Sequence, residues 1–156
     1  MKLFCGLCSI LTKEEPKPGF FSFVLFAPEA AMQAVPGQFA HILCGARTLR
    51  RPISICDFDA QKGTLRIVFE VRGEGTKWLS GREAGDSVDI LAPAGNGFIL
   101  PENPGRILLA GGGIGTPPLL ALAKRAPCDA VLGFKNAAAA ILTEEFGAAC
   151  GQALTV

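Results

Sequence analysis

One stretch of this sequence has residue types suited to holding a phosphate. Residues 50–56 are Arg-Arg-Pro-Ile-Ser-Ile-Cys, so a pair of cations and a hydroxyl flank a proline. A guanidinium binds phosphate through two parallel hydrogen bonds, and a serine hydroxyl can donate to a ring nitrogen or a carbonyl. The proline lacks a backbone donor, which favours an edge strand or a bulge. Taken alone, the stretch is explained better by a solvated arginine pair with a turn proline.

A glycine-rich turn offers a second feature of phosphate sites. Segment 107–122 runs from an apolar strand into Gly-Gly-Gly-Ile-Gly-Thr and then into a helix with prolines in its first turn. Glycines let a backbone turn sharply and approach a pyrophosphate, which a helix N-terminus attracts. The pattern departs from Gly-x-Gly-x-x-Gly because position 116 is Thr. A strand-to-helix turn without a ligand is therefore the competing interpretation.

A weaker turn of the same kind lies at 71–79, where Gly73, Gly75 and Thr76 stand between a strand and a short helix. Backbone N–H groups in such a turn can face an anion. On its own, a plain turn explains this segment at least as well. Two phosphate-ready turns in adjacent parts of the chain are more informative than either one.

The remaining reactive residues show no sign of hydrolytic or metal chemistry. The single histidine, His41, lies in a strand-like apolar run, which favours a structural role. Of the six cysteines, only Cys5 and Cys8 have the spacing of a metal or redox pair. If residues 3–11 form a strand, these two side chains point to opposite faces and cannot chelate one ion. We therefore expect structural thiols in a reducing compartment and no metal ligands.

Composition bounds the function further. The 156 residues include 15 basic and 14 acidic side chains, a formal net charge of +1, and 49% hydrophobic residues. This balance is typical of a globular protein and gives no electrostatic case for binding nucleic acid or an anionic membrane. The apolar run near the start lacks a cleavage site, and the run at 107–123 is too short and too rich in Gly and Pro to cross a membrane. A cytoplasmic protein is expected.

The elements that must position these residues change in kind along the chain. Runs rich in β-branched and aromatic residues, separated mostly by Pro, Gly or Asp turns, predict strands at 3–11, 20–28, 37–44, 51–58, 64–71 and 86–91. Six such strands indicate a small antiparallel barrel, interrupted by a short helix at 75–80.

After residues 100–105 the order becomes strand 106–112, helix 114–126, strand 129–134 and helix 136–149, with a third strand expected to begin at 153–156. This alternation implies a parallel, three-layer α/β arrangement. The predicted fold class is an antiparallel β-barrel domain at 1–99 followed by the first half of an α/β nucleotide-binding domain with a parallel sheet at 100–156.

Five motifs in this order resemble those of the ferredoxin-reductase-like flavoproteins, and look most like the electron-transfer subunits of the NAD-linked dihydroorotate dehydrogenases. The motifs are Pro36-Gly37-Gln38-Phe39, Arg50-Arg51-Pro52-Ile53-Ser54-Ile55, Gly73-Glu74-Gly75-Thr76, Gly95-Asn96-Gly97-Phe98 and Gly111-Gly112-Gly113-Ile114-Gly115. The resemblance implies that the barrel binds FAD and that the α/β domain binds NAD.

The resemblance also implies roles for individual residues. The FAD site would comprise Arg51, Pro52, Ile53, Ser54, Val68, Phe69, Glu70, Gly75 and Thr76, and the NAD site would comprise Gly111, Gly112, Gly113, Ile114 and Gly115. Arg51 would hold the flavin pyrophosphate, with Gly75 and Thr76 capping it. Ser54 would lie near the reactive edge of the isoalloxazine. The charge at 50–51 is then interpreted as a phosphate clamp.

In the family mechanism that this resemblance implies, electrons from dihydroorotate oxidation pass from FMN on a catalytic subunit through a [2Fe-2S] cluster and FAD to NAD⁺, in pyrimidine biosynthesis. The partner would be that FMN-containing catalytic subunit, in a heterotetramer. The family's cysteine-rich cluster motif has no match among the cysteines here. Alternatives are a subunit of another ferredoxin–NAD(P) reductase or sulfide-dehydrogenase-type flavoenzyme, or a truncated, non-catalytic fragment.

Overall fold

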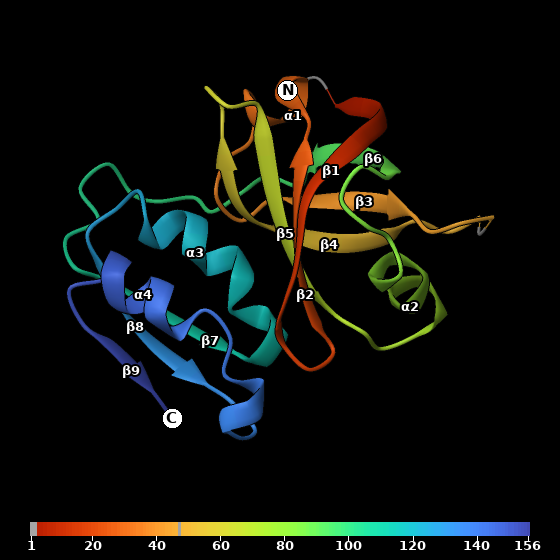
Figure 1. Ribbon diagram of the computed structural model, residues 1–156. Helices are drawn as coiled ribbons and strands as arrows, with labels where there is room; N and C mark the ends of the chain where they lie inside the picture. Colours follow the sequence, from red (N-terminus) through yellow and green to blue (C-terminus); the bar gives the residue numbers. More distant parts are fainter. Residues whose placement is uncertain (1–2, 47) are drawn as a thin grey trace.

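The computed structural model describes residues 3–46 and 48–156, which form a β-barrel beside a layered unit of helices and parallel strands (Figure 1). The barrel strands are β1 (Phe4–Lys17), β2 (Phe20–Phe26), β3 (Phe39–Leu43), β4 (Arg51–Asp59), β5 (Thr64–Glu70) and β6 (Ser87–Ala94). They close in the order β1-β2-β5-β4-β3-β6, and each neighbouring pair is antiparallel. The predicted antiparallel barrel is confirmed.

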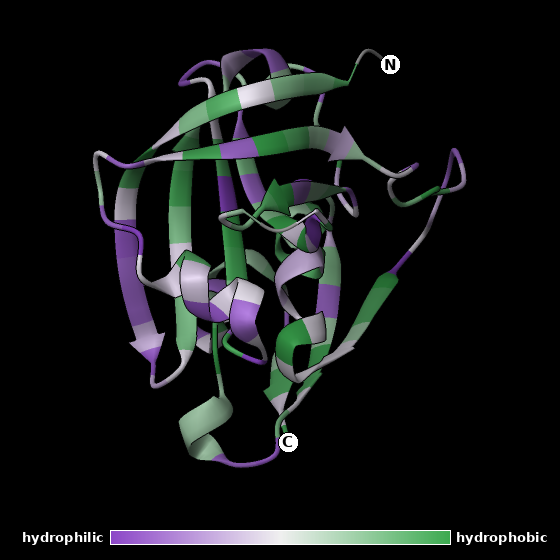
Figure 2. Ribbon diagram, turned by 90° about the vertical axis from the view of Figure 1, so that its right-hand side faces the viewer, coloured by the Kyte–Doolittle hydropathy of each residue, from purple (hydrophilic) through white to green (hydrophobic). Residues whose placement is uncertain are grey.

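The barrel interior is filled by alternate residues of each strand, because successive side chains point to opposite faces. On β5, Leu65, Ile67 and Phe69 are at most 1% exposed. Phe69 packs edge-on against Phe23 of β2, with ring centroids 5.3 Å apart. Figure 2 shows hydrophobic residues along the strands interrupted by hydrophilic ones. This is expected when residues that face the barrel core alternate with residues that face outward.

Two short helices accompany the barrel, α1 (Pro28–Ala31) and α2 (Glu74–Ser80). The predicted helix at 75–80 is confirmed and begins one residue earlier, whereas α1 was not predicted because four residues carry no helical period. Leu79 of α2 is fully buried in the barrel core, and Trp78 packs against that core. Helix α2 therefore belongs to the barrel and covers part of it.

The second unit contains β7 (Ile107–Gly112), η1 (Gly113–Gly115), α3 (Pro117–Ala123), β8 (Cys128–Gly133), η2 (Ala137–Ala139), α4 (Thr143–Ala149) and β9 (Ala153–Thr155). Its three strands are parallel in the order β7-β8-β9. The predicted alternation of strands and helices and the parallel sheet are confirmed, and the third strand begins where it was expected.

Residues 136–149, predicted as one helix, form two separate pieces. Asn136 accepts a hydrogen bond from the backbone N–H of Ala139 at 3.1 Å and starts the short turn η2. Leu142 then adopts a left-handed conformation with φ +62°, which ends any continuous helix before α4 begins. A run of alanines has high helix propensity, yet the chain leaves the helical path here, and the side chains of Ile141 and Leu142 that follow are buried.

Three layers were expected, but the described residues form only two. The reason is that α3 and α4 lie on the same face of the sheet, in contact with each other (Figure 1). Consecutive right-handed crossovers that advance in one direction place their helices on the same face. On the opposite face, Leu108 is 65% and Leu154 is 58% exposed.

A second apolar core joins the two units. It combines Phe20, Cys56 and Val68 from the outside of the barrel with Leu120 and Phe146 of helices α3 and α4, all at most 8% exposed. Helix α3 contacts β4, and η1 contacts β5. The barrel wall formed by β4 and β5 is therefore the surface on which the α/β unit rests. None of the helices described is long and apolar enough to cross a membrane.

Candidate functional site

Strands β4 and β5 pair along only part of their length. Their antiparallel ladder runs from Asp59 opposite Thr64 to Ile55 opposite Ile67, and no pairing continues beyond that point. Residues 51–54 still pair with β3, and residues 68–70 still pair with β2. The two strands thus diverge, and each has one backbone edge with no ladder partner there. This is the edge position that the proline at 52 predicted.

The predicted flavin residues divide between the two faces of these diverging strands. Ile53 is 9% and Phe69 is 1% exposed, and both side chains belong to the barrel core. Val68 belongs instead to the core under the α/β unit, and Ser54 is half-buried. Had the ladder continued, Ser54 would lie opposite Val68. Ile53 and Phe69 can therefore contribute only backbone groups to a ligand between the strands, whereas Ser54 also offers its hydroxyl.

Arg51 lies beside the start of α2. A Cβ atom added to Gly75 would lie 2.6 Å from Nε of Arg51, so the arginine occupies the space that any other residue at 75 would fill. Nη1 of Arg51 donates to the backbone oxygen of Leu49 at 3.0 Å, which leaves further guanidinium donors to bind another group. The two sequence motifs predicted to hold a phosphate are thus brought into contact.

Thr76 shapes the turn that precedes α2. Its hydroxyl oxygen accepts from the backbone N–H of Arg72 at 2.9 Å and of Gly73 at 3.2 Å, and its hydroxyl donates to the carbonyl of Gly73 at 3.0 Å. The side chain is fully used in holding the turn. Its observed role is therefore structural, in the turn that leads from β5 into α2.

Glu70 lies at the end of β5 beside this turn. Its carboxylate forms an ion pair with Nε of Arg72 at 2.7 Å. The predicted site residues at 70, 75 and 76 therefore form one continuous segment from β5 into α2.

Arg50 does not join the predicted clamp. Its Nη2 pairs with Oδ1 of Asp89 at 2.8 Å, and its Nη1 donates to the backbone oxygens of Asp89 at 3.2 Å and His41 at 3.4 Å. Neighbouring residues on a strand point to opposite faces, so only one of two adjacent arginines can face a given site. Arg51 lies against the Gly75 turn, whereas Arg50 ties the start of β4 to β3 and β6.

The turn at Gly111–Gly115 is built for close packing. A Cβ on Gly111 would lie 2.7 Å from Cδ1 of Leu119 in α3, so this position accepts no larger residue without movement. Gly113 has φ +50°, and the hydroxyl of Thr116 donates to its carbonyl at 3.0 Å. Thr116 is fully buried, so the threonine at the position of the third glycine packs inside the protein. The contact of η1 with β5 brings the predicted nicotinamide turn to the strand predicted to line the flavin site.

The motifs at 36–39 and 95–98, for which the sequence predicted no individual roles, pack against each other. Gln38, 1% exposed, donates from Nε2 to the carbonyl of Gly95 at 2.8 Å and accepts from the N–H of Val35 at 2.8 Å. A Cβ on Gly37 would lie 2.8 Å from the ring of Phe98. The buried amide of Gln38 is thus hydrogen-bonded on both its donor and its acceptor side. Its place in the Pro-Gly-Gln-Phe motif was the only sign of this role in the sequence. This pair of motifs adjoins the site because Phe39 pairs with Ser54.

His41 and the cysteines lie outside the candidate site's chemistry. His41 packs edge-on against Phe39, with ring centroids 5.0 Å apart. On β1, Cys5 is exposed and Cys8 is buried, so their side chains lie on opposite faces. In the described ranges, no three His, Cys, Asp or Glu side chains gather as a metal site requires. These residues do not fit a [2Fe-2S] cluster.

Burial makes the thiol at the junction of the two units unreactive. Cys56 follows the diverging part of β4 and is 0% exposed. Desolvation raises the pKa of its thiol to about 12, despite the opposing effect of the nearby Arg66. The thiol is therefore neutral at physiological pH and behaves as a small apolar side chain.

A wide cavity lies away from the diverging strands, at the opposite end of β4 and β5. It measures about 840 Å³ and is lined by the 57–62 turn together with Arg66, Lys124 and Arg125. The candidate site is thus defined by the free backbone edges of β4 and β5 and by the contact between Arg51 and Gly75, and it does not coincide with this cavity.

Comparison with known proteins gives a consistent result. The chain is 45% identical over 123 residues to the dihydroorotate dehydrogenase B (NAD(+)) electron transfer subunit of Bacillus caldolyticus, covering 72% of this chain and 48% of that protein. It is 41% identical over 147 residues to the subunit of the same name from Streptococcus mutans, covering 88% and 56%. The chain therefore spans about half the length of the curated relatives it matches. No family model matches it.

Solved structures share the fold. An NADH-dependent reduced ferredoxin–NADP oxidoreductase superposes with a TM-score of 0.86 at 30% identity, over 95% of this chain and 55% of that one. Phthalate dioxygenase reductase superposes with a TM-score of 0.75 at 19% identity, over 95% and 51%, which shows the fold alone. On sequence identity over most of its length and on this fold, the chain belongs to the family of the dihydroorotate dehydrogenase B electron transfer subunits, whose architecture is ferredoxin-reductase-like.

Proposed function

We propose that this chain is an FAD-binding electron-transfer unit of an oxidoreductase, and that it exchanges electrons between FAD on the barrel and NAD at the α/β unit. The observation that carries the proposal is the divergence of β4 and β5, with Arg51 against Gly75 at one side and η1 against β5 at the other. This arrangement supplies a slot with free backbone edges, a cation for a pyrophosphate and a glycine turn for a second nucleotide.

The residues present fit FAD in three respects. A glycine at 75 leaves room for the arginine stem, and the guanidinium of Arg51 retains donors suited to a pyrophosphate. Backbone groups at 53–54 and 68–69 lack ladder partners between the strands and can pair with a flat polar ring. The hydroxyl of Ser54, half-buried on the wall that faces the α/β unit, can donate to that ring. Bound there, the flavin supplies the redox chemistry, and the protein supplies its placement and electrostatics.

The α/β unit supplies the nucleotide turn of the proposal. Gly111, Gly112, Gly113, Ile114 and Gly115 form the end of β7 and η1, and they approach β5. The turn lies at the carboxyl end of its strand, where open α/β sheets bind ligands. Its contact with β5 supports the proposal, because hydride transfer requires the two cofactors to lie next to each other.

The relatives support a more specific task, which we also propose. Their name implies a catalytic subunit that oxidises dihydroorotate, and the chain would then relay electrons from that FMN-containing subunit to NAD⁺ in a cytoplasmic heterotetramer for pyrimidine biosynthesis. Because the described residues do not fit a [2Fe-2S] cluster, no step through such a cluster is assigned to them. The second candidate is a subunit of another ferredoxin–NAD(P) reductase, favoured by the 0.86 TM-score with such an enzyme.

The decisive experiment is flavin binding by the purified chain. We expect the visible absorption bands of bound flavin, or their appearance when FAD is added to apoprotein, and release of FAD on denaturation. A chain that remains colourless with added FAD would overturn the proposal. Co-purification with a dihydroorotate-oxidising protein, as opposed to a ferredoxin-dependent one, distinguishes the two candidate tasks.

The Arg51→Ala variant tests the site itself. Loss of a charge-assisted hydrogen bond to the pyrophosphate should weaken FAD binding by about 1.5–3 kcal/mol, measured by fluorescence titration. Arg106→Ala is the matched control because Arg106 lies at the start of β7 with its side chain 77% exposed, paired to Asp129 within the α/β unit. Equal FAD affinity in Arg51→Ala and wild-type protein would remove Arg51 from the site.

A further inference from the structure

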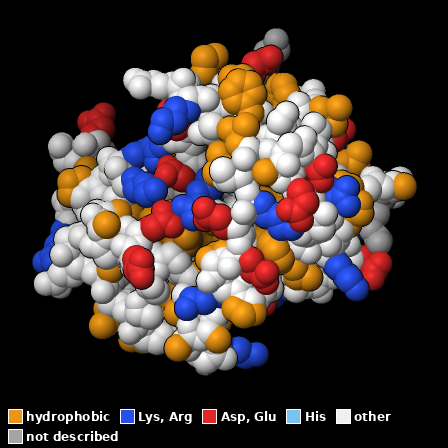
Figure 3. Space-filling model, in the orientation of Figure 1, with side chains coloured by type: hydrophobic (Ala, Val, Ile, Leu, Met, Phe, Trp, Pro, Cys, Tyr) orange, Lys and Arg blue, Asp and Glu red, His pale blue; other side chains and the backbone are white. Residues whose placement is uncertain are grey.

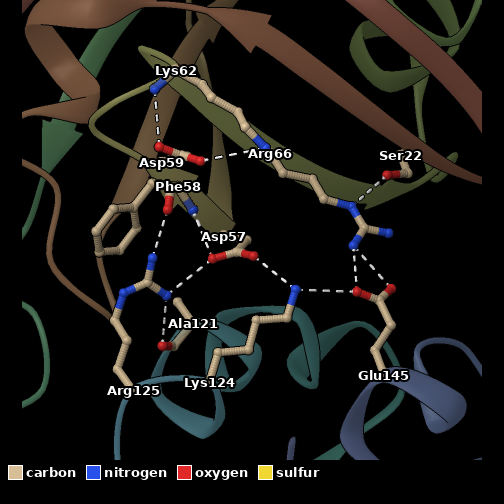
Figure 4. A network of polar contacts seen from close by, with 10 residues as sticks. All are labelled: Ser22, Asp57, Phe58, Asp59, Lys62, Arg66, Ala121, Lys124, Arg125 and Glu145. Atoms are coloured by element: carbon tan, nitrogen blue, oxygen red, sulfur yellow. Dashed lines mark hydrogen bonds and ion pairs between the residues drawn. The ribbon is translucent and has the colours of Figure 1, made fainter. Parts of the chain in front are cut away.

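A network of charged side chains bridges the barrel and the α/β unit (Figure 4). Two of its members, Asp57 and Arg66, lie on β4 and β5 of the barrel. The other three belong to the α/β unit: Lys124 and Arg125 directly follow α3, and Glu145 lies in α4. The space-filling view shows acidic and basic side chains intermixed across the middle of this face (Figure 3). The same β4–β5 wall carries the proposed flavin edges a few residues away.

Arg66 is the link between β5 and α4. Its Nη1 contacts both carboxylate oxygens of Glu145, at 2.7 and 2.9 Å, and its Nε donates to the hydroxyl of Ser22 on β2 at 2.9 Å. Ser22 is 3% exposed, so one end of the guanidinium is anchored inside the barrel wall. The arginine is thus fixed on both sides, and it fixes the position of α4 relative to β5.

Asp57 is the link between β4 and the end of α3. Its two carboxylate oxygens accept from Nζ of Lys124 at 2.8 Å and from Nη1 of Arg125 at 3.0 Å. Arg125 also donates to the backbone oxygen of Phe58, and its guanidinium carbon lies 3.9 Å from the centroid of the Phe58 ring. Lys124 reaches Glu145 as well, at 3.4 Å, which joins the two links into one network.

The charges in this network are matched to their positions. Burial alone would raise the pKa of the Asp57 carboxyl, but hydrogen bonds from Lys124 and Arg125 outweigh it and hold the pKa below its ordinary value. Glu145 behaves in the same way, with Arg66 and Lys124 as the donors. Both carboxylates are therefore ionised and paired under physiological conditions.

The network and the apolar core beneath it have different tasks. Burial of Cys56, Val68 and Phe146 holds the two units together, but apolar attraction has no direction and permits sliding and rotation. Hydrogen-bonded ion pairs have fixed lengths and angles, and therefore select one arrangement. Because η1 contacts β5, the arrangement so selected also sets where the Gly113–Gly115 turn lies relative to Val68–Glu70.

We propose that Arg66, Glu145, Lys124, Asp57 and Arg125 form an ionic latch that fixes the α/β unit on the β4–β5 wall and so positions the nicotinamide turn against the flavin strand. Arg66 and Asp57 are positioning residues that touch neither cofactor. The second half of this statement rests on the proposed function, whereas the latch itself does not.

Cys56 provides a native reporter of the latch. It is 0% exposed between the barrel wall and the α/β unit, so it becomes accessible when the units separate. Cys8 and Cys44, at 2% and 0% exposed, lie inside the barrel core and stay protected unless the whole barrel opens. Cys5 is already exposed in the folded protein. Labelling with N-ethylmaleimide, followed by peptide mass mapping, measures each site separately in one sample.

The test compares wild-type protein with Glu145→Gln and Asp57→Asn, which keep the shape of each side chain and remove its charge. We expect Cys56 to label about three- to tenfold faster in either variant, the scale of a partly exposed ion-pair network released into local opening, with Cys8 and Cys44 unchanged. High salt should accelerate Cys56 labelling in wild-type protein and much less in the variants. Arg106→Gln, which breaks an ion pair within the α/β unit, should leave Cys56 unchanged.

Each outcome decides one part of the proposal. Unchanged labelling of Cys56 in both variants overturns the latch, and faster labelling of all buried cysteines shows general destabilisation and also overturns it. With FAD bound, the rate of flavin bleaching by NADH should fall in Glu145→Gln while FAD affinity stays constant. Faster Cys56 labelling with an unchanged bleaching rate overturns the positioning role. A chain that binds no FAD refutes the proposed function, while Cys56 still reports on the latch.

Discussion

The backbone of Gly75 lies so close to Arg51 that a Cβ atom would stand 2.6 Å from Nε of the arginine. Two residues 24 positions apart in the printed sequence therefore depend on each other's type. The arginine keeps its place only because the first turn of α2 has no side chain there. This contact turns two weak sequence signals into one site.

The Gly75→Ala substitution should separate binding from stability. Alanine favours a helix over glycine by about 1 kcal/mol, so the melting temperature should stay constant or rise. The added methyl must displace Arg51, so FAD affinity should fall about tenfold, by fluorescence titration. Gly147→Ala in α4, where a Cβ meets nothing within 4 Å, is the control and should keep full affinity. Unchanged FAD affinity in Gly75→Ala would contradict the proposed contact.

The two neighbouring arginines should show opposite effects. Arg50→Ala leaves Asp89 without its partner between β3 and β6, and should lower the free energy of unfolding by about 1–3 kcal/mol, measured by urea denaturation. Its effect on FAD affinity should be small. Arg51→Ala should show the reverse pattern, with binding lost and stability retained. Similar losses of FAD affinity in both variants would restore the idea of a two-arginine clamp.

The tight turn at Gly111 should respond to its neighbour. Gly111→Ala places a methyl 2.7 Å from Cδ1 of Leu119 and should cost about 1–3 kcal/mol of stability through overpacking. Combining it with Leu119→Ala removes the clash, so the double variant should lose less than the two single losses added together. Strict additivity of the unfolding free energies would show that the turn relaxes in another way.

Acid should weaken the protein through Asp57 and Glu145. Both carboxyls have a folded pKa below the unfolded value, so their stabilisation is present above the unfolded pKa and is lost as pH falls through the folded pKa. The free energy of unfolding should be nearly flat from pH 7 to about pH 5 and then fall. The double variant Asp57→Asn and Glu145→Gln should fall less steeply. Asp59 and Asp129, whose pKa values are also lowered, keep their share of the decline.

Much of this architecture was predictable because the strands carry their period in the sequence. The alternation of buried and half-buried residues in β3 and β8 is a direct consequence of two-residue periodicity. Proline at 52 correctly indicated that its strand has a free edge. Glycine at 111 and 113 correctly indicated a turn that only small residues permit.

Other features depend on contacts that no local pattern contains. Arg50 forms an ion pair with Asp89, which lies 39 positions later in the sequence. The two residues meet only because β3 and β6 pair. The helix predicted over 136–149 is interrupted at Leu142, whose left-handed backbone accompanies the burial of Ile141 and Leu142 in the second core, and helix propensity alone predicts the opposite. The ion pairs that cross between the two units join residues 67 to 79 positions apart, and each charge on its own resembles an ordinary surface side chain.

Closure of the barrel by β1 and β6 has a consequence for the order in which the molecule assembles. The proposed flavin strands are a hairpin, with Asp59 opposite Thr64, and such local pairs form within microseconds. Joining Phe4 to Ala92 must instead close a loop that contains most of the barrel, which raises contact order and slows folding. The contact of α4 with Arg66 forms later still, because α4 lies at residues 143–149 of the chain. During synthesis the β4–β5 hairpin can therefore exist before the barrel that encloses it, and the wall for the α/β unit precedes the unit itself.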